Sequence, residues 1–101
     1  MLFRSQIIKN KLTKLPQNIG KLKTLRFLYI NENSLSNLPT TFTGLVNLER
    51  LSISNNPKLI VPNDIDKLKN LSNFDLRDCN INSILQQGII KKLLPNCKIQ
   101  F

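Results

Sequence analysis

The sequence predicts an α/β solenoid, in which short coils of similar structure stack along one axis. Leucine-headed segments begin at Leu2, Leu25, Leu48 and Leu71, each 23 residues after the last, and Leu94 begins a partial fifth segment. A fixed period of this length is typical of repeat units that bury a core only by stacking. Apolar residues at the first, fourth and sixth positions of each segment predict a short strand with one buried face.

The repeat resembles that of a known family. Segments such as LRFLYINENSL and LERLSISNNPKL follow L-x-x-L-x-L-x-x-N/C-x-L, and KLPQNIGKLKT and NLPTTFTGLVN follow LPxxIGxLxx in their downstream halves. The chain is similar over essentially its whole length to the leucine-rich repeat family, in the 23-residue form of intracellular Ras-suppressor-type and bacterial proteins. That resemblance implies a curved leucine-rich-repeat solenoid of class α/β. Parallel strands would lie on its concave side, with short helical or irregular segments on its convex side.

Each strand segment is expected to point its leucines inward. The predicted interior residues are Leu25, Leu28 and Ile30, then Leu48, Leu51 and Ile53, then Leu71, Phe74 and Leu76. The ninth position carries Asn10, Asn33, Asn56 or Cys79. A buried amide there can bond backbone groups of the turn and of the adjacent coil.

The return segments begin at Pro16, Pro39 and Pro62, where a fixed φ favours a turn or a first helical position. We expect the apolar residues that follow them to point back into the stack. These are Ile19, Phe42 and Ile65, followed by Leu22, Leu45 and Leu68.

We expect residues 1–101 to form a single domain, with repeats starting near residues 2, 25, 48 and 71 and a C-terminal cap over about 85–101. GIIKKLL shifts the fourth return segment toward a true helix, with Ile89, Leu93 and Ile90 as candidates to face the stack. Continuing the 23-residue period from Leu71 places Cys97 in the last strand. An N-terminal cap is expected to be absent. The first coil is then either part of a longer array, which we favour, or covered by a partner or a second copy.

The hypothesis for function is recognition of a protein or peptide partner on the concave face. Strand positions that flank the leucines point outward, and the third, fifth and seventh positions form columns there. Aromatic residues and Arg are enriched in binding hot spots. The candidate partner-binding residues are Arg4, Gln6, Phe27, Tyr29, Asn31, Arg50, Ser52, Asn73, Asp75 and Arg77. The same period places Asn96 in the third-position column and Lys98 in the fifth.

Two alternatives remain open. The chain is a segment of a larger leucine-rich-repeat scaffold with no binding of its own, or its net charge of +9 attracts nucleic acid or a membrane surface. Lys21, Lys23, Lys67 and Lys69 flank the convex leucines, and we interpret them as solvating that face. Nucleic-acid and membrane partners are therefore not expected, whereas self-association through the first coil is possible.

Catalysis is not expected. The chain has no His and only three Gly, so it has no imidazole base, no catalytic triad and no glycine-rich phosphate cradle. Cys79 and Cys97 fall at core positions without metal-ligand spacing, which indicates reduced, buried thiols. No cofactor, metal site or catalytic residue is predicted. No signal peptide is recognised, so we expect a cytoplasmic protein.

Overall fold

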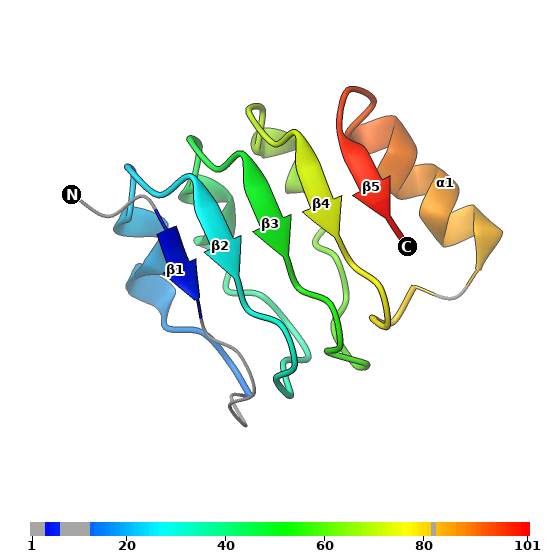
Figure 1. Ribbon diagram of the computed structural model, residues 1–101, viewed down its shortest axis with the longest axis horizontal. Coiled ribbons are helices and arrows are strands. Elements are labelled where there is room, and N and C mark those ends of the chain that lie inside the picture. Colours follow the sequence, from blue (N-terminus) through cyan, green and yellow to red (C-terminus); the bar gives the residue numbers. More distant parts are fainter. Residues whose placement is uncertain (1–3, 7–12, 82) are drawn as a thin grey trace.

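The computed structural model describes residues 13–81 and 83–101, and the backbone of Arg4–Gln6. Its five strands are β1 (Arg4–Gln6), β2 (Phe27–Tyr29), β3 (Arg50–Ser52), β4 (Asn73–Asp75) and β5 (Lys98–Gln100). They form one parallel sheet in chain order (Figure 1). The connections carry the 3₁₀ helices η1 (Gln17–Lys21), η2 (Phe42–Gly44) and η3 (Ile65–Lys67), and the α-helix α1 (Ile84–Leu93). The α/β solenoid of stacked coils predicted from the sequence is confirmed.

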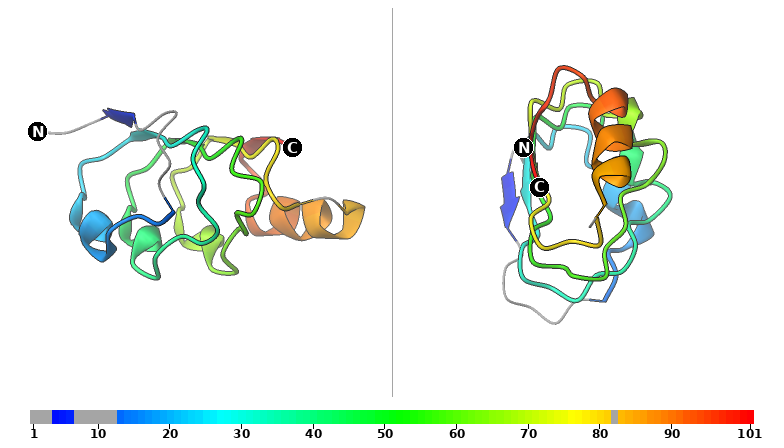
Figure 2. Two further views of the ribbon diagram at one scale, coloured as in Figure 1. Left: turned by 90° about the horizontal axis from the view of Figure 1, so that it is seen from below. Right: turned by 90° about the vertical axis from the view of Figure 1, so that its right-hand side faces the viewer.

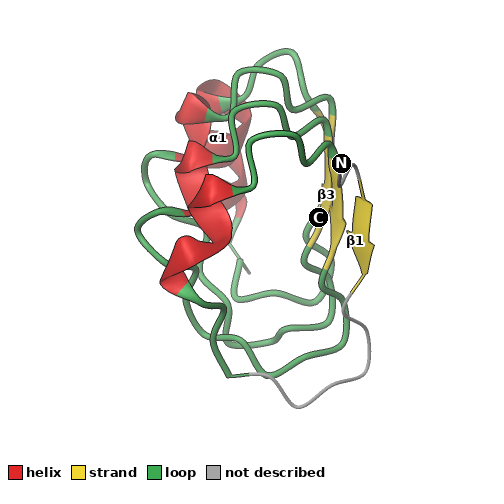
Figure 3. Cartoon of the chain, turned by 90° about the vertical axis from the view of Figure 1, so that its left-hand side faces the viewer, coloured by secondary structure: helices red, strands yellow, loops and turns green. Residues whose placement is uncertain are grey.

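Strands and helices lie on opposite sides of the coil stack (Figures 2 and 3). The coils that begin with β2, β3 and β4 each run through a strand, turn, and return through a helical segment on the other side (Figure 2). Leu28, Leu51 and Phe74 are paired in register across β2, β3 and β4, and each is 2% exposed or less. All nine predicted interior residues of repeats two to four are buried. The hydrophobic core is thus a continuous column between the two sides.

The ninth-position residues are buried as predicted in the three described repeats. Asn33, Asn56 and Cys79 are at most 6% exposed. The Asn56 amide nitrogen donates to the carbonyl oxygens of Ile53, 2.8 Å away, and Ile30, 3.0 Å away. Cys79 takes the same role with a thiol, because its Sγ donates to the Ile53 carbonyl oxygen at 3.0 Å. Asn10 lies outside the described residues, as do Leu2, Ile7 and Leu12 of the first coil.

The prolines begin the return segments as predicted. The carbonyl oxygens of Pro16, Pro39 and Pro62 accept from the amides three residues later, at Ile19, Phe42 and Ile65. These three apolar residues are buried, as are Leu45 and Leu68. The expectation that Leu22 points into the stack was wrong, because this residue is 37% exposed. Leu59, which comes one residue late in its repeat, is fully buried.

The position of the last strand differs from the prediction by two residues. Lys98, Ile99 and Gln100 pair with Asn73, Phe74 and Asp75, so Ile99 follows Phe74 by 25 residues instead of 23. The longer α1 replaces a 3₁₀ turn in this coil. An α-helix advances about 1.5 Å per residue against about 2.0 Å for a 3₁₀-helix, so more residues are needed to cover the same span. Cys97 therefore precedes β5 and is partly exposed.

Of the three residues predicted to face the stack from α1, Ile90 is buried and Leu93 packs partly buried against the core, whereas Ile89 is 51% exposed. Leu94, which was not among the candidates, is also buried. Ser83 determines where the helix begins: its Oγ accepts from the Gln86 amide at 3.1 Å, and the Gln86 side chain accepts from the Ser83 amide at 3.3 Å. This capping box sets the helical phase so that Ile90 and Leu94, four residues apart, share the inward face.

Candidate partner-binding face

The outward face of the sheet carries two rows of side chains. Register places Phe27, Arg50, Asn73 and Lys98 on adjacent strands, and we call these residues the first row. Tyr29, Ser52, Asp75 and Gln100 form the second row, two residues further along each strand. The backbones of Arg4 and Gln6 continue the two rows on β1, but their side chains lie outside the described residues.

An aromatic ring and a guanidinium form the N-terminal part of the first row. The Arg50 guanidinium carbon lies 5.3 Å from the centroid of the Phe27 ring, which is within cation–π range. Phe27 is partly buried, whereas Arg50 is exposed. The ring therefore orients the guanidinium while its N–H donors stay accessible from solvent.

Ser52 lies beneath the surface of the face. It is 6% exposed, and Ser54 is 3% exposed. The Asn31 side-chain amide donates to both hydroxyl oxygens. In its row Ser52 lies between the larger Tyr29 and Asp75, which explains why a residue at an outward position is covered. The structure therefore places Ser52 as a support for Asn31 and not as an exposed contact residue.

Asp75 and Arg77 form an internal ion pair. Arg77 Nε and Nη2 donate to the two carboxylate oxygens of Asp75 at 2.9 and 2.8 Å, and the Arg77 amide donates to Oδ1 at 3.2 Å. The hydrogen bonds from the Arg77 side chain hold the pKa of Asp75 below its ordinary value, although partial burial acts in the opposite direction. The two charges thus balance each other within the face.

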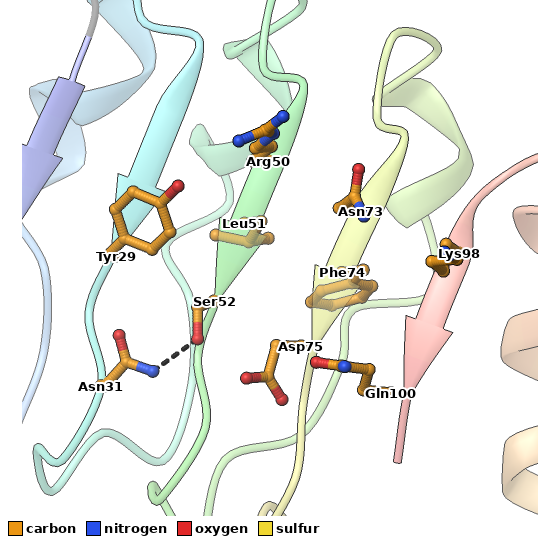
Figure 4. A pocket seen from close by; sticks show the side chains of 10 residues that line it. All are labelled: Tyr29, Asn31, Arg50, Leu51, Ser52, Asn73, Phe74, Asp75, Lys98 and Gln100. Carbon is orange, nitrogen blue, oxygen red and sulfur yellow. Dashed lines mark hydrogen bonds between the residues drawn. The ribbon is translucent and has the colours of Figure 1, made fainter.

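Residues of both rows, together with Asn31 just after β2, line an open hollow of about 560 Å³ on this face (Figure 4). The residues that line it are Tyr29, Asn31, Arg50, Leu51, Ser52, Asn73, Phe74, Asp75, Lys98 and Gln100. Six of the ten sequence-predicted site residues are among them: Tyr29, Asn31, Arg50, Ser52, Asn73 and Asp75. Phe27 and Arg77 are placed beside the hollow by their contacts with Arg50 and Asp75.

Lys98 and Gln100 line the hollow but are absent from the sequence-predicted set. The uniform period assigned Lys98 to the second row and Asn96 to the first, whereas the register of β5 puts Lys98 in the first row and Gln100 in the second. The helical pattern of GIIKKLL was the signal for a longer coil. It did not give the number of extra residues.

The chemistry of the cysteine thiols argues against nucleophilic use. Burial raises the pKa of Cys79 and of Cys97 to about 11, so both thiols stay protonated at neutral pH.

Across the described ranges, no three His, Cys, Asp or Glu side chains gather in a way that would hold a metal ion. Within those same ranges, no helix has the length and hydrophobicity that a membrane span requires.

Two of the convex lysines have partners within the chain. Lys23 Nζ donates to the Gly44 carbonyl oxygen at 2.7 Å, and Lys67 lies 3.7 Å from an Asp64 carboxylate oxygen, three residues earlier. These contacts join neighbouring coils or stabilise a 3₁₀ turn. They support the interpretation that Lys23 and Lys67 serve the structure and solvation of the helical side, and do not form a basic surface for nucleic acid or membrane.

Comparison with known proteins agrees with this architecture. The family described as a leucine-rich repeat region matches residues 6–94. Among solved structures, a leucine-rich repeat protein of Leptospira interrogans is 38% identical in sequence and superposes with a TM-score of 0.90. The match covers 97% of this chain and 25% of that one, so the chain spans about a quarter of the length of that relative. A search of curated proteins gives no match.

Proposed function

The chain belongs to the leucine-rich repeat family, and from this we propose that its concave face binds an extended segment of another protein. The family and the fold support a role as a protein-interaction module, and members of the family are generally scaffolds without catalytic activity. The hydrogen bonds that hold Ser52 and Asp75 in the second row, and the hollow that the two rows line, support the finer proposal that the strand face is the binding surface.

The observation that carries the proposal is the grouping of Phe27, Tyr29 and Arg50 at one side of the hollow. Aromatic and Arg side chains contribute most of the binding energy at many interfaces. Phe27 and Tyr29 project from the same side of β2, and Arg50 lies over the Phe27 ring. A ligand that enters the hollow meets Tyr29 and Arg50 directly.

The size of the face favours a peptide or a loop over a large folded domain. Five strands about 4.8 Å apart, with about 12 Å of outward strand each, project roughly 300 Å². A typical stable interface buries about 800 Å² per partner. An extended segment that lies across the strands would use most of the available area.

The test is selection of peptides from a random displayed library on the immobilised chain, followed by affinity measurement by fluorescence anisotropy. Phe27→Ala and Tyr29→Ala should each weaken binding about tenfold or more, as expected for hot-spot residues. Val46→Ala is the matched control, because Val46 is an exposed apolar residue between η2 and β3, outside the two rows. Circular dichroism should show that all three variants remain folded.

Three outcomes would contradict the proposal that the concave face binds a peptide. If selected peptides bind the Phe27 and Tyr29 variants as tightly as the wild-type chain, the concave face is not the binding surface. If no peptide is selected at all, the chain acts as a scaffold segment. Binding that is lost only with rising salt, and equally in all variants, would favour the nonspecific basic alternative.

A further inference from the structure

We infer that the bound segment is acidic, and that two of its carboxylates bind Arg50 and Lys98 in the first row. This inference rests on the proposed function and specifies the chemistry of its partner. It depends on the observed register of β5, which brings Lys98 into line with Arg50.

Arg50 and Lys98 have no acidic partner in the part of the chain that the structure describes, where the ion pairs are Arg26–Glu49, Lys67–Asp64 and Arg77–Asp75. Both side chains are exposed and both line the hollow. Asp75 is the acidic residue that lines the same hollow, and its two carboxylate oxygens are bound by Arg77. The hollow therefore carries two positive charges that nothing in the described chain balances.

The spacing of the two cations suits an extended peptide. Arg50 and Lys98 lie on strands separated by β4, so their backbones are about 10 Å apart at about 4.8 Å per strand. In an extended segment, residues that face the same side are about 6.8 Å apart. Because Arg and Lys side chains are long, they can close the remaining gap toward carboxylates at positions i and i+2.

Between the two cations lies an uncharged side chain that can bond a peptide group. Asn73 is exposed, and its position between Arg50 and Lys98 in the first row is visible in Figure 4. At the lower part of the hollow in Figure 4, Gln100 adds an amide group, and Asn31 offers its Oδ1 as an acceptor, because its Nδ2 donates to Ser52 and Ser54. The amides of Asn73 and Gln100 can donate as well as accept, so they match the N–H and C=O groups of an extended backbone.

These features favour a protein segment over a nucleic acid. A single-stranded nucleic acid is bound through many phosphate contacts and a platform of stacked aromatic rings. The hollow has two unbalanced cations and one lining Tyr, and its other polar groups include the carboxylate of Asp75. The number of cations matches an acidic pair in a peptide better than a phosphate backbone.

The experiment uses the tightest library-selected peptide and its counterpart in which every Glu is replaced by Gln and every Asp by Asn. Selected peptides should be enriched in Glu or Asp at positions i and i+2. The neutral counterpart should bind the wild-type chain about tenfold more weakly, and Arg50→Gln and Lys98→Gln should each weaken binding of the acidic peptide about fivefold or more. Lys58→Gln removes the same charge from an exposed residue outside the hollow, and it should change affinity less than twofold.

Charge reversal gives a second test that does not depend on loss of binding. Arg50→Glu should abolish binding of the acidic peptide, and a peptide with one Glu replaced by Lys should recover affinity for that variant. Lys98→Glu should be rescued by a Lys at the other acidic position. Recovery at matching positions would assign each carboxylate to one cation, which a merely structural role for Arg50 or Lys98 would not produce.

The inference is wrong if the neutral peptide binds as well as the acidic one, or if Lys58→Gln is as harmful as Lys98→Gln. It is also wrong if a fluorescein-labelled dodecameric oligo-dT binds more tightly than the acidic peptide and depends on Arg50 and Lys98. The proposed function fails separately, when Tyr29→Ala leaves peptide binding unchanged. A neutral peptide that still depends on Tyr29 would keep the concave site and remove only its preference for acidic partners.

Discussion

The side-chain amide of Asn56 donates to the carbonyl oxygen of Ile30, 3.0 Å away and in the preceding coil. The same nitrogen bonds the Ile53 carbonyl oxygen of its own coil at 2.8 Å, and Oδ1 accepts from the Leu35 amide at 3.2 Å. One fully buried side chain thus satisfies backbone groups of two coils where the chain turns away from the sheet. This arrangement joins neighbouring repeats in a way that leucine packing alone does not.

Asn56→Ala should lower the free energy of unfolding by about 3 kcal/mol, because buried backbone groups would lose a partner that water cannot replace. Urea denaturation of the variant and the wild-type chain would measure the difference. Asn37→Ala is the control: Asn37 is exposed, so its replacement should cost less than about 0.5 kcal/mol. Equal stability of the two variants would show that the Asn56 bonds contribute nothing net.

Glu32, Asn55 and Asp78 occupy the same position in successive repeats, and each has a positive φ of 58–60°. Asn tolerates this left-handed conformation better than Glu does. We therefore expect Glu32→Asn to raise the free energy of unfolding by about 0.5 to 1 kcal/mol. The reverse exchange, Asn55→Glu, should lower it by a similar amount. Thermal unfolding of both variants tests the pair, and shifts of the same sign would contradict the conformational argument.

Two glycines should respond in opposite directions to replacement by Ala. A Cβ at Gly20 in η1 would overlap the carbonyl oxygen of Thr41 from the next coil, so Gly20→Ala should cost about 1 to 3 kcal/mol. A Cβ at Gly88 in α1 would meet no atom within 4 Å. Gly88→Ala should therefore stabilise the chain by about 0.5 to 1 kcal/mol through higher helix propensity. Urea denaturation would reveal both effects, and a stable Gly20→Ala variant would contradict the close packing of η1 against η2.

Asp75 should make stability depend on acidic pH. Its pKa is lowered in the folded chain from the ordinary value of 3.8, chiefly by the Arg77 hydrogen bonds. The contribution is therefore complete above that ordinary value and is lost as pH falls through the lower, folded pKa. Because the Arg77 side chain is 59% exposed, we expect a contribution of no more than about 1 kcal/mol.

Unfolding of the wild-type chain and of Asp75→Asn at pH 7 and pH 2 would measure this contribution. The difference in free energy between the two proteins should shrink toward zero at the lower pH. Asp66→Asn serves as the control, because Asp66 is exposed and makes no ion pair within the described ranges. A difference that stays constant across pH would mean that the Asp75 charge is not the source of the effect.

Much of this architecture was predictable because equivalent positions recur every 23 residues, so each repeat can be compared with the next. The 23-residue spacing predicted that Leu28, Leu51 and Phe74 would share one column, and register confirms it. The outward direction of Phe27 and Tyr29 follows from strand alternation about a buried Leu28. Which of these outward residues contact a partner remains a prediction.

Other features could not be predicted from the spacing. Ser52 occupies an outward position but is covered, because its side chain is shorter than its row neighbours Tyr29 and Asp75. Arg77 and Asp75 are two residues apart, and they pair only because both side chains adopt suitable conformations. The sequence does not specify those conformations. The consequence of the pairing is electrostatic, since it leaves Arg50 and Lys98 as the unbalanced charges of the hollow.

The sequence by itself determined the repeat, its buried leucine columns and the asparagine or cysteine that joins the coils, because these features follow from a period and from the need to satisfy buried groups. Only the tertiary structure decided that Lys98, and not Asn96, stands in line with Arg50. The physical reason is α1, whose smaller rise per residue and Ser83 capping box require two more residues in the fourth coil before β5 can pair with β4.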